Sequence, residues 1–149
     1  MLFVTFVANL NRRSFLPRIT RMTQIEESRI LYKDLSYKII GLAMQVHTEL
    51  GFGFLEKVYE NALMVLFEEN GIEAVQQVPI AVPFHGRIVG EYVADIIVEN
   101  SIILELKALD RIAEIHKAQT LNYLKATSFR LALLINFGKL RMEYERLVK

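Results

Sequence analysis

Two acidic residues and a lysine interrupt an otherwise apolar stretch at residues 92–107, YVADIIVENSIILELK. Its period-two alternation predicts two β-strands joined by a polar turn at residues 99–101. Alternate side chains of a strand share a face, so Glu105 and Lys107 lie on one side of the second strand, and Asp95 lies in the first strand. Paired carboxylates beside an ammonium group are chemistry that a plain core strand does not need.

The length of the turn decides whether the acids meet. If residues 99–101 form the loop, the antiparallel register places Asp95 directly opposite Glu105. Opposed like charges repel by roughly 0.2 to 1 kcal/mol, and a bound Mg²⁺ or Mn²⁺ would convert this repulsion into coordination. A two-residue turn would instead shift the register by one and place the carboxylates on opposite faces.

Three motifs carry a resemblance to a known family. Asp95, followed after a short hairpin by Glu105-Leu106-Lys107, resembles the PD-(D/E)XK nuclease superfamily, with Ala94 where that motif often has proline. Residues 53–59, GFLEKVY, match the pattern that names the GxxExxY proteins, and residues 119–123, QTLNY, resemble the QxxxY element of the RecB-type branch. The order and spacing of the motifs are more specific than any one of them, and the resemblance covers about residues 31–149.

The resemblance implies an α/β fold of the restriction-endonuclease-like kind, with a mixed central sheet flanked by helices. It also implies a metal-dependent nuclease that hydrolyses phosphodiester bonds, with DNA the favoured substrate. Mg²⁺ or Mn²⁺ held by Asp95, Glu105 and the Leu106 carbonyl would polarise a phosphodiester oxygen and make a water more acidic. Lys107 would orient that water and stabilise the charge that develops on the phosphate.

Glu56 and Tyr59 lie one turn apart at the start of a helix predicted over residues 55–70. A glutamate in a first turn is ordinarily explained by the helix dipole, worth roughly 0.3 to 1 kcal/mol. The resemblance instead places Glu56 beside the metal, as a ligand or as a residue that supports the catalytic site. We expect Tyr59 to be a packing residue with its hydroxyl at the edge of the site.

A helix predicted over residues 111–125 presents His116, Gln119 and Tyr123 on one face. Gln119 both donates and accepts hydrogen bonds, so it suits a phosphate, a bound water or the ammonium of Lys107. A polar rim on a packed helix explains the same pattern, and we prefer that explanation for His116. For Gln119 the QxxxY resemblance favours the site.

The remaining elements follow from hydrophobic periodicity and turn residues. We expect a helix over residues 32–50 capped by Asp34, an edge strand over 74–84, a strand over 87–98 and a buried central strand over 131–137. His85 and Gly86 mark the hairpin between the first two strands. The final segment alternates, which predicts a half-exposed strand with Leu140, Met142 and Tyr144 facing inward.

Composition bounds the functional classes. The chain has 149 residues, no cysteine, a net charge of +1 and a hydrophobic fraction of 52%. These values exclude disulfides, thiolate zinc sites and cysteine nucleophiles, and they give no strong global field for nucleic acid. The high hydrophobicity suggests well-buried strands or an oligomer interface, so a homodimer is worth testing. A cytoplasmic location fits the composition.

The first 30 residues do not take part in the resemblance. Residues 1–10, MLFVTFVANL, are too few to span a bilayer as a helix, and the arginines follow the run where a secretory signal has them first. We expect no membrane role and divide the chain into a leader, residues 1–30, and a nuclease-like domain, residues 31–149. Met22 is a candidate native start; an extra element that packs on the domain is the alternative.

Two other functions remain open at this stage. A nuclease-like fold that binds nucleic acid or a protein partner without cutting would keep the same motifs. A carboxylate and lysine network that serves stability alone would need Lys107 merely to neutralise one acid. The presence of Glu56, Asp95, Glu105 and Lys107 together favours catalysis.

Overall fold

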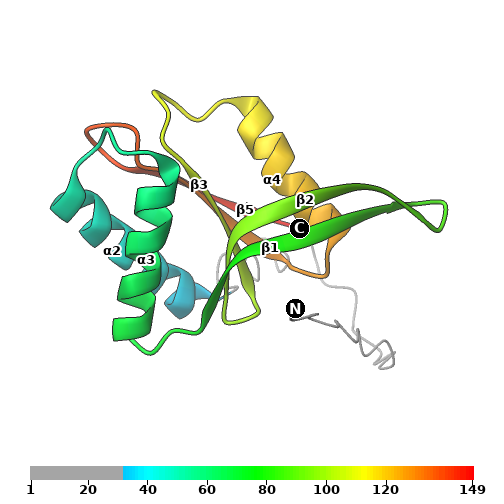
Figure 1. Cartoon of the computed structure of the whole chain (residues 1–149), viewed down its shortest axis with the longest axis horizontal. Helices are drawn as coiled ribbons and strands as arrows, with labels where there is room; N and C mark the ends of the chain where they lie inside the picture. Colours follow the sequence, from blue (N-terminus) through cyan, green and yellow to red (C-terminus); the bar gives the residue numbers. More distant parts are fainter. Residues whose placement is uncertain (1–31) are drawn as a thin grey trace, which may run out of the picture. The chain divides into compact units, whose positions relative to one another are not determined.

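The computed structural model describes residues 32–149, and this part of the chain folds into three helices and five strands (Figure 1). In chain order these are α2 (Lys33–Leu50), α3 (Glu56–Glu69), β1 (Ala74–Phe84), β2 (Arg87–Val98), β3 (Ile102–Lys107), α4 (Glu114–Ala126), β4 (Leu131–Asn136) and β5 (Glu143–Val148). The expected order of helices and strands is confirmed. The predicted leader lies outside the described residues.

The five strands form one mixed sheet in the order β1-β2-β3-β4-β5. All neighbouring pairs are antiparallel except β3 and β4, which run parallel and are connected through α4. The pairing of Val98 with Ile102 shows that residues 99–101 form the connection, which confirms the register expected from the sequence. The predicted mixed α/β sheet is therefore correct.

The helices cover both faces of the sheet and bury two apolar clusters. The larger cluster joins α2 and α3 to alternate residues of β2, β3 and β4, including Ile96, Leu104 and Leu133. The smaller cluster lies on the other face, where Tyr123 and Leu124 of α4 pack with Ile103. The residues of β4 are all buried, as expected for a central strand between two helical layers.

Strands β1 and β2 continue past the rest of the sheet as a two-stranded arm (Figure 1). Pairing of β2 with β3 stops at Ile96, whereas pairing of β1 with β2 continues to Phe84 and Arg87. The turn at the tip has left-handed φ angles of 49° at His85 and 75° at Gly86, which is the geometry that suits a tight hairpin. The predicted hairpin and edge strand are confirmed.

Three local predictions are wrong. Asp34 lies in the first turn of α2, and Tyr32 takes the cap position without a side-chain hydrogen bond. Helix α4 begins at Glu114 instead of residue 111, because residues 111–113 connect it to β3. The inward pattern expected of the last strand also fails: β5 begins at Glu143, and Leu140 is 80% exposed in the preceding turn.

No helix in the part of the chain from residue 32 onward is long and apolar enough to cross a bilayer.

Candidate active site

Asp95 and Glu105 meet where β2 separates from β3. The antiparallel ladder runs from Val98–Ile102 to Ile96–Leu104, so the next step would pair Asp95 with Glu105. The ladder ends there, and the Asp95 carboxylate accepts a hydrogen bond of 2.7 Å from the backbone N–H of Leu106. The two acids therefore occupy the opposed positions that the three-residue turn predicted.

An irregularity in the neighbouring strand marks the same position. The register of β1 with β2 pairs Gln76 with Ile96 and Val78 with Ala94, and leaves Gln77 and Asp95 unpaired between them. Gln77 has a left-handed φ of 53°, a conformation that costs a non-glycine residue about 1 to 3 kcal/mol. Asp95 therefore has no regular ladder partner in either neighbouring strand, β1 or β3.

The irregularity turns the ribbon over. In β1, Ala74 packs against the cluster under α2 and α3, whereas Val78 and Ile80 pack against the cluster under α4. Residues an even number apart in a regular strand share a face, so the ribbon reverses its faces between them. Asp95 stands at this reversal, which explains why its side chain caps the backbone of β3 instead of continuing the alternation.

Burial and repulsion make Glu105 a weak carboxylic acid when no cation is bound. Its side chain lies in the core, with a relative exposure of 4%. Burial, and then the negative charge of Asp95, raise the pKa of Glu105 to about 8, while Lys107 opposes the shift. The pKa of Asp95 is also raised, first by burial, although the N–H of Leu106 acts in the opposite direction.

The structure tests whether these residues suit a cation. The Oε1 atom of Glu105 is buried and has no hydrogen-bond partner among the described residues. A buried oxygen without such a partner, at the register position opposite a second acid, is what a divalent cation would satisfy. The described residues contain no group of three acidic, histidine or cysteine side chains close enough to enclose a metal. Mg²⁺ fits such a sparse set, because it keeps several of its waters.

Glu56 and Lys107 contribute opposite charges to this centre. Glu56 is exposed in the first turn of α3, and its charge raises the pKa of both Asp95 and Glu105. Lys107 lies at the end of β3, and its positive charge lowers the pKa of both acids. No ion pair within residues 32–149 occupies Lys107.

On helix α4, Tyr123 lies close enough to Glu105 and Asp95 to sense their charges. Tyr123 is hydrogen-bonded to Gln119 and packs at 5.3 Å against the ring of Tyr92. Burial and the charges of Glu105 and Asp95 raise the pKa of Tyr123 to about 12, so its phenol stays protonated at neutral pH.

His116 has a different task. Its Nδ1 accepts a hydrogen bond of 2.9 Å from the N–H of Ala113 and so caps the first turn of α4. This geometry agrees with the structural explanation that the sequence favoured.

Tyr59 is a core residue whose hydroxyl serves a loop. Its ring is fully buried and stacks on Phe137 with centroids 4.6 Å apart. The hydroxyl donates to the carbonyl of Gly51 at 2.7 Å and accepts from the N–H of Phe54 at 3.2 Å. The Tyr59 hydroxyl therefore holds the loop that precedes Glu56. We had expected this hydroxyl at the edge of the site, but both of its hydrogen bonds are to the loop.

Glu60 is a buried acid that the sequence analysis did not identify. It lies one turn beyond Glu56, has a relative exposure of 3%, and raises the pKa of Asp95. Its carboxylate accepts hydrogen bonds from Lys57, Gln76 and Gln77. An acid three residues before another buried position, Leu63, was the available signal, because a plain core stripe would have an apolar residue there.

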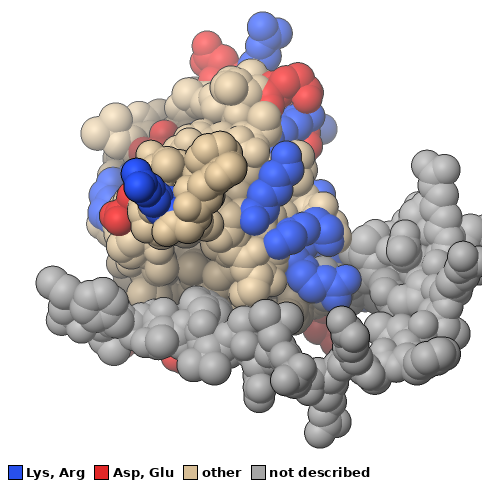
Figure 2. Space-filling view, turned by 90° about the vertical axis from the view of Figure 1, so that its right-hand side faces the viewer, with Lys and Arg blue, Asp and Glu red and all other residues tan. Residues whose placement is uncertain are grey.

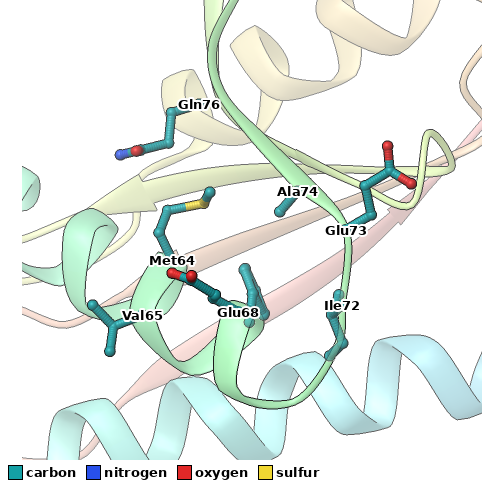
Figure 3. Close-up of a pocket in the computed structure, with 8 residues that line it drawn as sticks. Met64, Val65, Glu68, Ile72, Glu73, Ala74 and Gln76 are labelled. Carbon is teal, nitrogen blue, oxygen red and sulfur yellow. The ribbon is translucent and has the colours of Figure 1, made fainter.

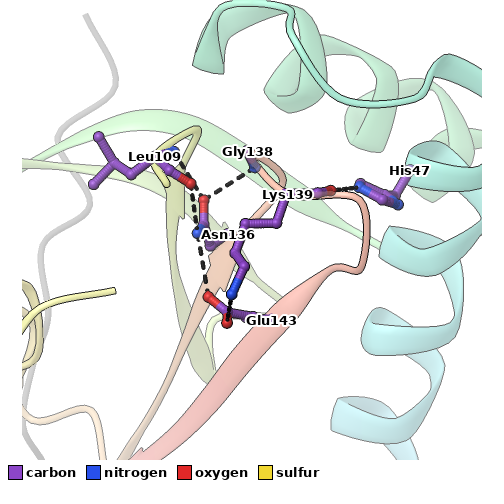
Figure 4. A network of polar contacts seen from close by, with 6 residues as sticks. All are labelled: His47, Leu109, Asn136, Gly138, Lys139 and Glu143. Atoms are coloured by element: carbon purple, nitrogen blue, oxygen red, sulfur yellow. Dashed lines mark hydrogen bonds and ion pairs between the residues drawn. The ribbon is translucent and has the colours of Figure 1, made fainter. Parts of the chain in front are cut away.

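The end of β3 is held by a satisfied polar network around Asn136 (Figure 4). The buried amide of Asn136 accepts from the N–H groups of Leu109 and Gly138 at 2.9 and 3.0 Å and donates to the Leu109 carbonyl at 2.9 Å. A Cβ on Gly138 would lie 2.3 Å from the Leu109 backbone, so a larger residue does not fit. Lys107 and Asn136 are register partners, so this network fixes the strand end that carries the lysine.

A hollow of about 470 Å³ lies elsewhere, between the second half of α3 and the start of β1 (Figure 3). Its lining combines apolar side chains with Glu68 and Glu73, and no lysine or arginine from residues 32–149 belongs to it. It also contains neither Asp95 nor Glu105. This hollow is therefore separate from the acid pair at the end of the β2–β3 ladder.

The fold and the opposed acids define a nuclease-like α/β domain, and the comparisons agree. The sequence model of the PD-(D/E)XK nuclease superfamily matches residues 33–147. The chain belongs to this superfamily.

A solved structure described as "Crystal structure of SSO0001" is similar in fold, with a TM-score of 0.51 and 18% sequence identity. The match covers 81% of this chain and 61% of that protein, and it supports the fold alone. No curated protein matches the chain.

Proposed function

We propose that the protein is a nuclease that uses Mg²⁺ or Mn²⁺ to hydrolyse phosphodiester bonds, with DNA as the favoured substrate. Membership of a nuclease superfamily supports the reaction class. The observation that carries the proposal is the buried oxygen of Glu105, which has no hydrogen-bond partner within residues 32–149 and lies at the position opposite Asp95. A stability network would satisfy that oxygen, whereas a cation site leaves it available.

Each residue then has a role. Asp95, Glu105 and the carbonyl of Leu106 would hold the cation, with Glu56 as a further or supporting ligand. When bound, the cation neutralises charge on the phosphate and favours ionisation of an attacking water. Lys107 would orient this water and stabilise the negative charge that develops on the phosphate oxygens. Gln119 would position the substrate or Lys107, and Tyr123 would hold Gln119.

A basic surface at one end of α4 supports a nucleic acid partner. Three exposed cations lie there: Lys125, Arg130 and Lys149. The side-chain ammonium of Lys149 donates to the Thr127 carbonyl at 2.7 Å, and its backbone N–H donates to the Arg130 carbonyl at 3.0 Å. The ion pairs of residues 32–149 include none of these three cations. Lys and Arg side chains gather on the face that Figure 2 shows, with few acids between them. Unneutralised cations of this kind contact phosphates.

The motif at residues 53–59 supports placement in the GxxExxY branch of the superfamily. A homodimer and a cytoplasmic location stay predictions from composition.

Cleavage assays test the proposal. Purified protein is incubated with plasmid, linear and single-stranded DNA and with RNA, with Mn²⁺, with Mg²⁺ or with EDTA. We expect cleavage that depends on the cation and is lost in Asp95→Ala and Lys107→Ala. Asp110→Ala is a matched control, because Asp110 is an exposed acid shortly after β3. Cleavage that survives in both site variants would come from a contaminant and would refute the proposal.

The second candidate is a nuclease-like module that binds nucleic acid or a protein partner without cutting. The small net charge of +1 favours it, because a weak global field suits a protein that does not hold a long phosphate backbone. DNA binding that weakens steeply with salt, with no turnover in any cation, would support this candidate over the first.

A further inference from the structure

Glu60 sits at the junction between α3 and the irregular part of β1. Its Oε1 accepts from the side-chain amide of Gln77 at 2.5 Å, and its Oε2 accepts from Gln76 at 2.6 Å and from the ammonium of Lys57. Both carboxylate oxygens are therefore engaged, and the group is almost fully buried. An acid bound in this way is poorly suited to act as a metal ligand itself.

Gln77 needs an external contact to keep its backbone conformation. It has a left-handed φ of 53° in the middle of a strand, although it is not glycine. It is also exposed, so packing does not hold it there. The hydrogen bond to Glu60 is the contact that fixes its side chain, and the negative charge of the acceptor makes that bond strong.

The position of Gln77 links this contact to Asp95. The two residues are the pair omitted from the register between Gln76–Ile96 and Val78–Ala94, so they lie opposite each other on adjacent strands. If Gln77 adopted an ordinary extended conformation, successive side chains of β1 and β2 would continue to alternate between the two faces of the ribbon through Asp95. Asp95 would then no longer be placed to accept the N–H of Leu106.

We propose that Glu60 is a positioning residue, which holds Gln77 in its left-handed conformation and thereby sets the direction of the Asp95 carboxylate. The catalytic consequence rests on the function proposed above, whereas the structural consequence does not. Glu60 acts through β1 and contacts neither the substrate nor the reacting atoms.

Hydrogen exchange at the Leu106 amide tests the structural part, because this N–H is bonded to Asp95. We expect Gln77→Ala and Glu60→Gln to speed exchange at Leu106 at least about tenfold relative to the amides of β4, which report opening of the whole sheet. Gln76→Ala is the matched control: it removes a neighbouring bond to Glu60 but leaves Gln77 intact. In this control we expect exchange within about twofold of the wild type.

Glycine provides a rescue. Because glycine adopts positive φ angles without strain, Gln77→Gly should retain more protection at Leu106 than Gln77→Ala, although it lacks the amide. Gln77 is exposed, so neither variant creates a cavity.

Kinetics test the catalytic part. For Gln77→Ala we expect kcat to fall at least about tenfold, with KM within about twofold of the wild type. The double variant with Glu60→Gln should have a kcat little lower than that of Gln77→Ala, because the two residues act as one unit. If the wild type does not cleave, the proposed function fails while the exchange experiment still decides the positioning role. Two results would overturn the inference. In the first, the Leu106 amide of Gln77→Ala exchanges at the wild-type rate. In the second, Gln76→Ala speeds Leu106 exchange as much as Gln77→Ala does.

Discussion

Two buried polar clusters lie near the end of β3, and they are built in opposite ways. Around Asn136 the donors and acceptors are matched, with the Leu109 backbone bonded through both its N–H and its carbonyl. At the acid pair, Glu105 has an oxygen without a partner in the described part of the chain, and its pKa is raised to about 8. The first cluster has its hydrogen bonds satisfied, whereas the second leaves a buried carboxylate oxygen unsatisfied among the described residues, and we propose that a divalent cation satisfies it.

The difference separates stability from function. A satisfied network such as that of Asn136 holds its surroundings in one arrangement. An opposed acid pair destabilises the protein without a cation and becomes favourable when one binds. Lys107 is linked to both clusters, because it is paired in register with Asn136 and its charge lowers the pKa of Glu105. The network around Asn136 therefore fixes the strand end that carries Lys107, the residue to which we assign a catalytic role.

The largest expected effect is the loss of cleavage activity in the Lys107→Ala variant. Removing the ammonium should lower kcat by roughly 10³-fold, because in the proposed mechanism it stabilises charge that develops in the transition state. The free energy of unfolding should fall far less steeply, because Lys107 is partly exposed and its charge only partly offsets the raised pKa values of the acids. Single-turnover cleavage and urea unfolding measure the two quantities. Lys38→Ala, an exposed lysine on α2, is the control and should cleave normally.

The next effect concerns pH. The pKa of Glu105 is raised in the folded protein from 4.5 to about 8, so the folded state binds more protons than the unfolded state between these values. Stability without a cation should therefore be full below about pH 4.5 and fall as pH rises towards 8, by up to about 4 kcal/mol.

Glu105→Gln tests the pH effect, because it removes the titrating group. Most of this slope should disappear in the variant, as followed by urea unfolding in EDTA. An unchanged slope would assign the effect to other groups, and Asp95 is the first to examine because its pKa is raised as well.

A smaller effect is expected at the satisfied cluster. Asn136→Ala leaves the N–H groups of Leu109 and Gly138 without their acceptor, which should lower the free energy of unfolding by about 2 to 3 kcal/mol. The slope of stability with pH should remain, because Glu105 is unchanged. Loss of that slope in the variant would show that the two clusters are not separate.

The smallest effect is expected at His116. His116→Ala removes the acceptor for the Ala113 N–H and should cost about 1 kcal/mol of stability. Cleavage should stay within about threefold of the wild type at low temperature, whereas Gln119→Ala should reduce it further. Greater loss in His116→Ala than in Gln119→Ala would contradict the structural explanation of His116 and assign it a role in the site.

The sequence predicted most of the fold because its signals are local. Turn residues at 85–86 and 99–101 set both hairpin registers, and the register alone placed Asp95 opposite Glu105. The final strand was misplaced because alternation begins at Leu140, before the residues that pair with β4. Glu60 was missed because its partners, Gln76 and Gln77, come from a distant strand with an irregularity that no composition signal announces.

Crystallography with Mn²⁺ tests the central claim most directly. Crystals of the wild type grown with Mn²⁺ near pH 8 should show an anomalous peak about 2.2 Å from carboxylate oxygens of both Asp95 and Glu105. Asp95→Asn crystals grown in the same way should show a weaker peak or none. A peak that neither acid contacts would contradict the claim that they share one cation. The absence of any peak between Asp95 and Glu105 at saturating Mn²⁺ would contradict it as well.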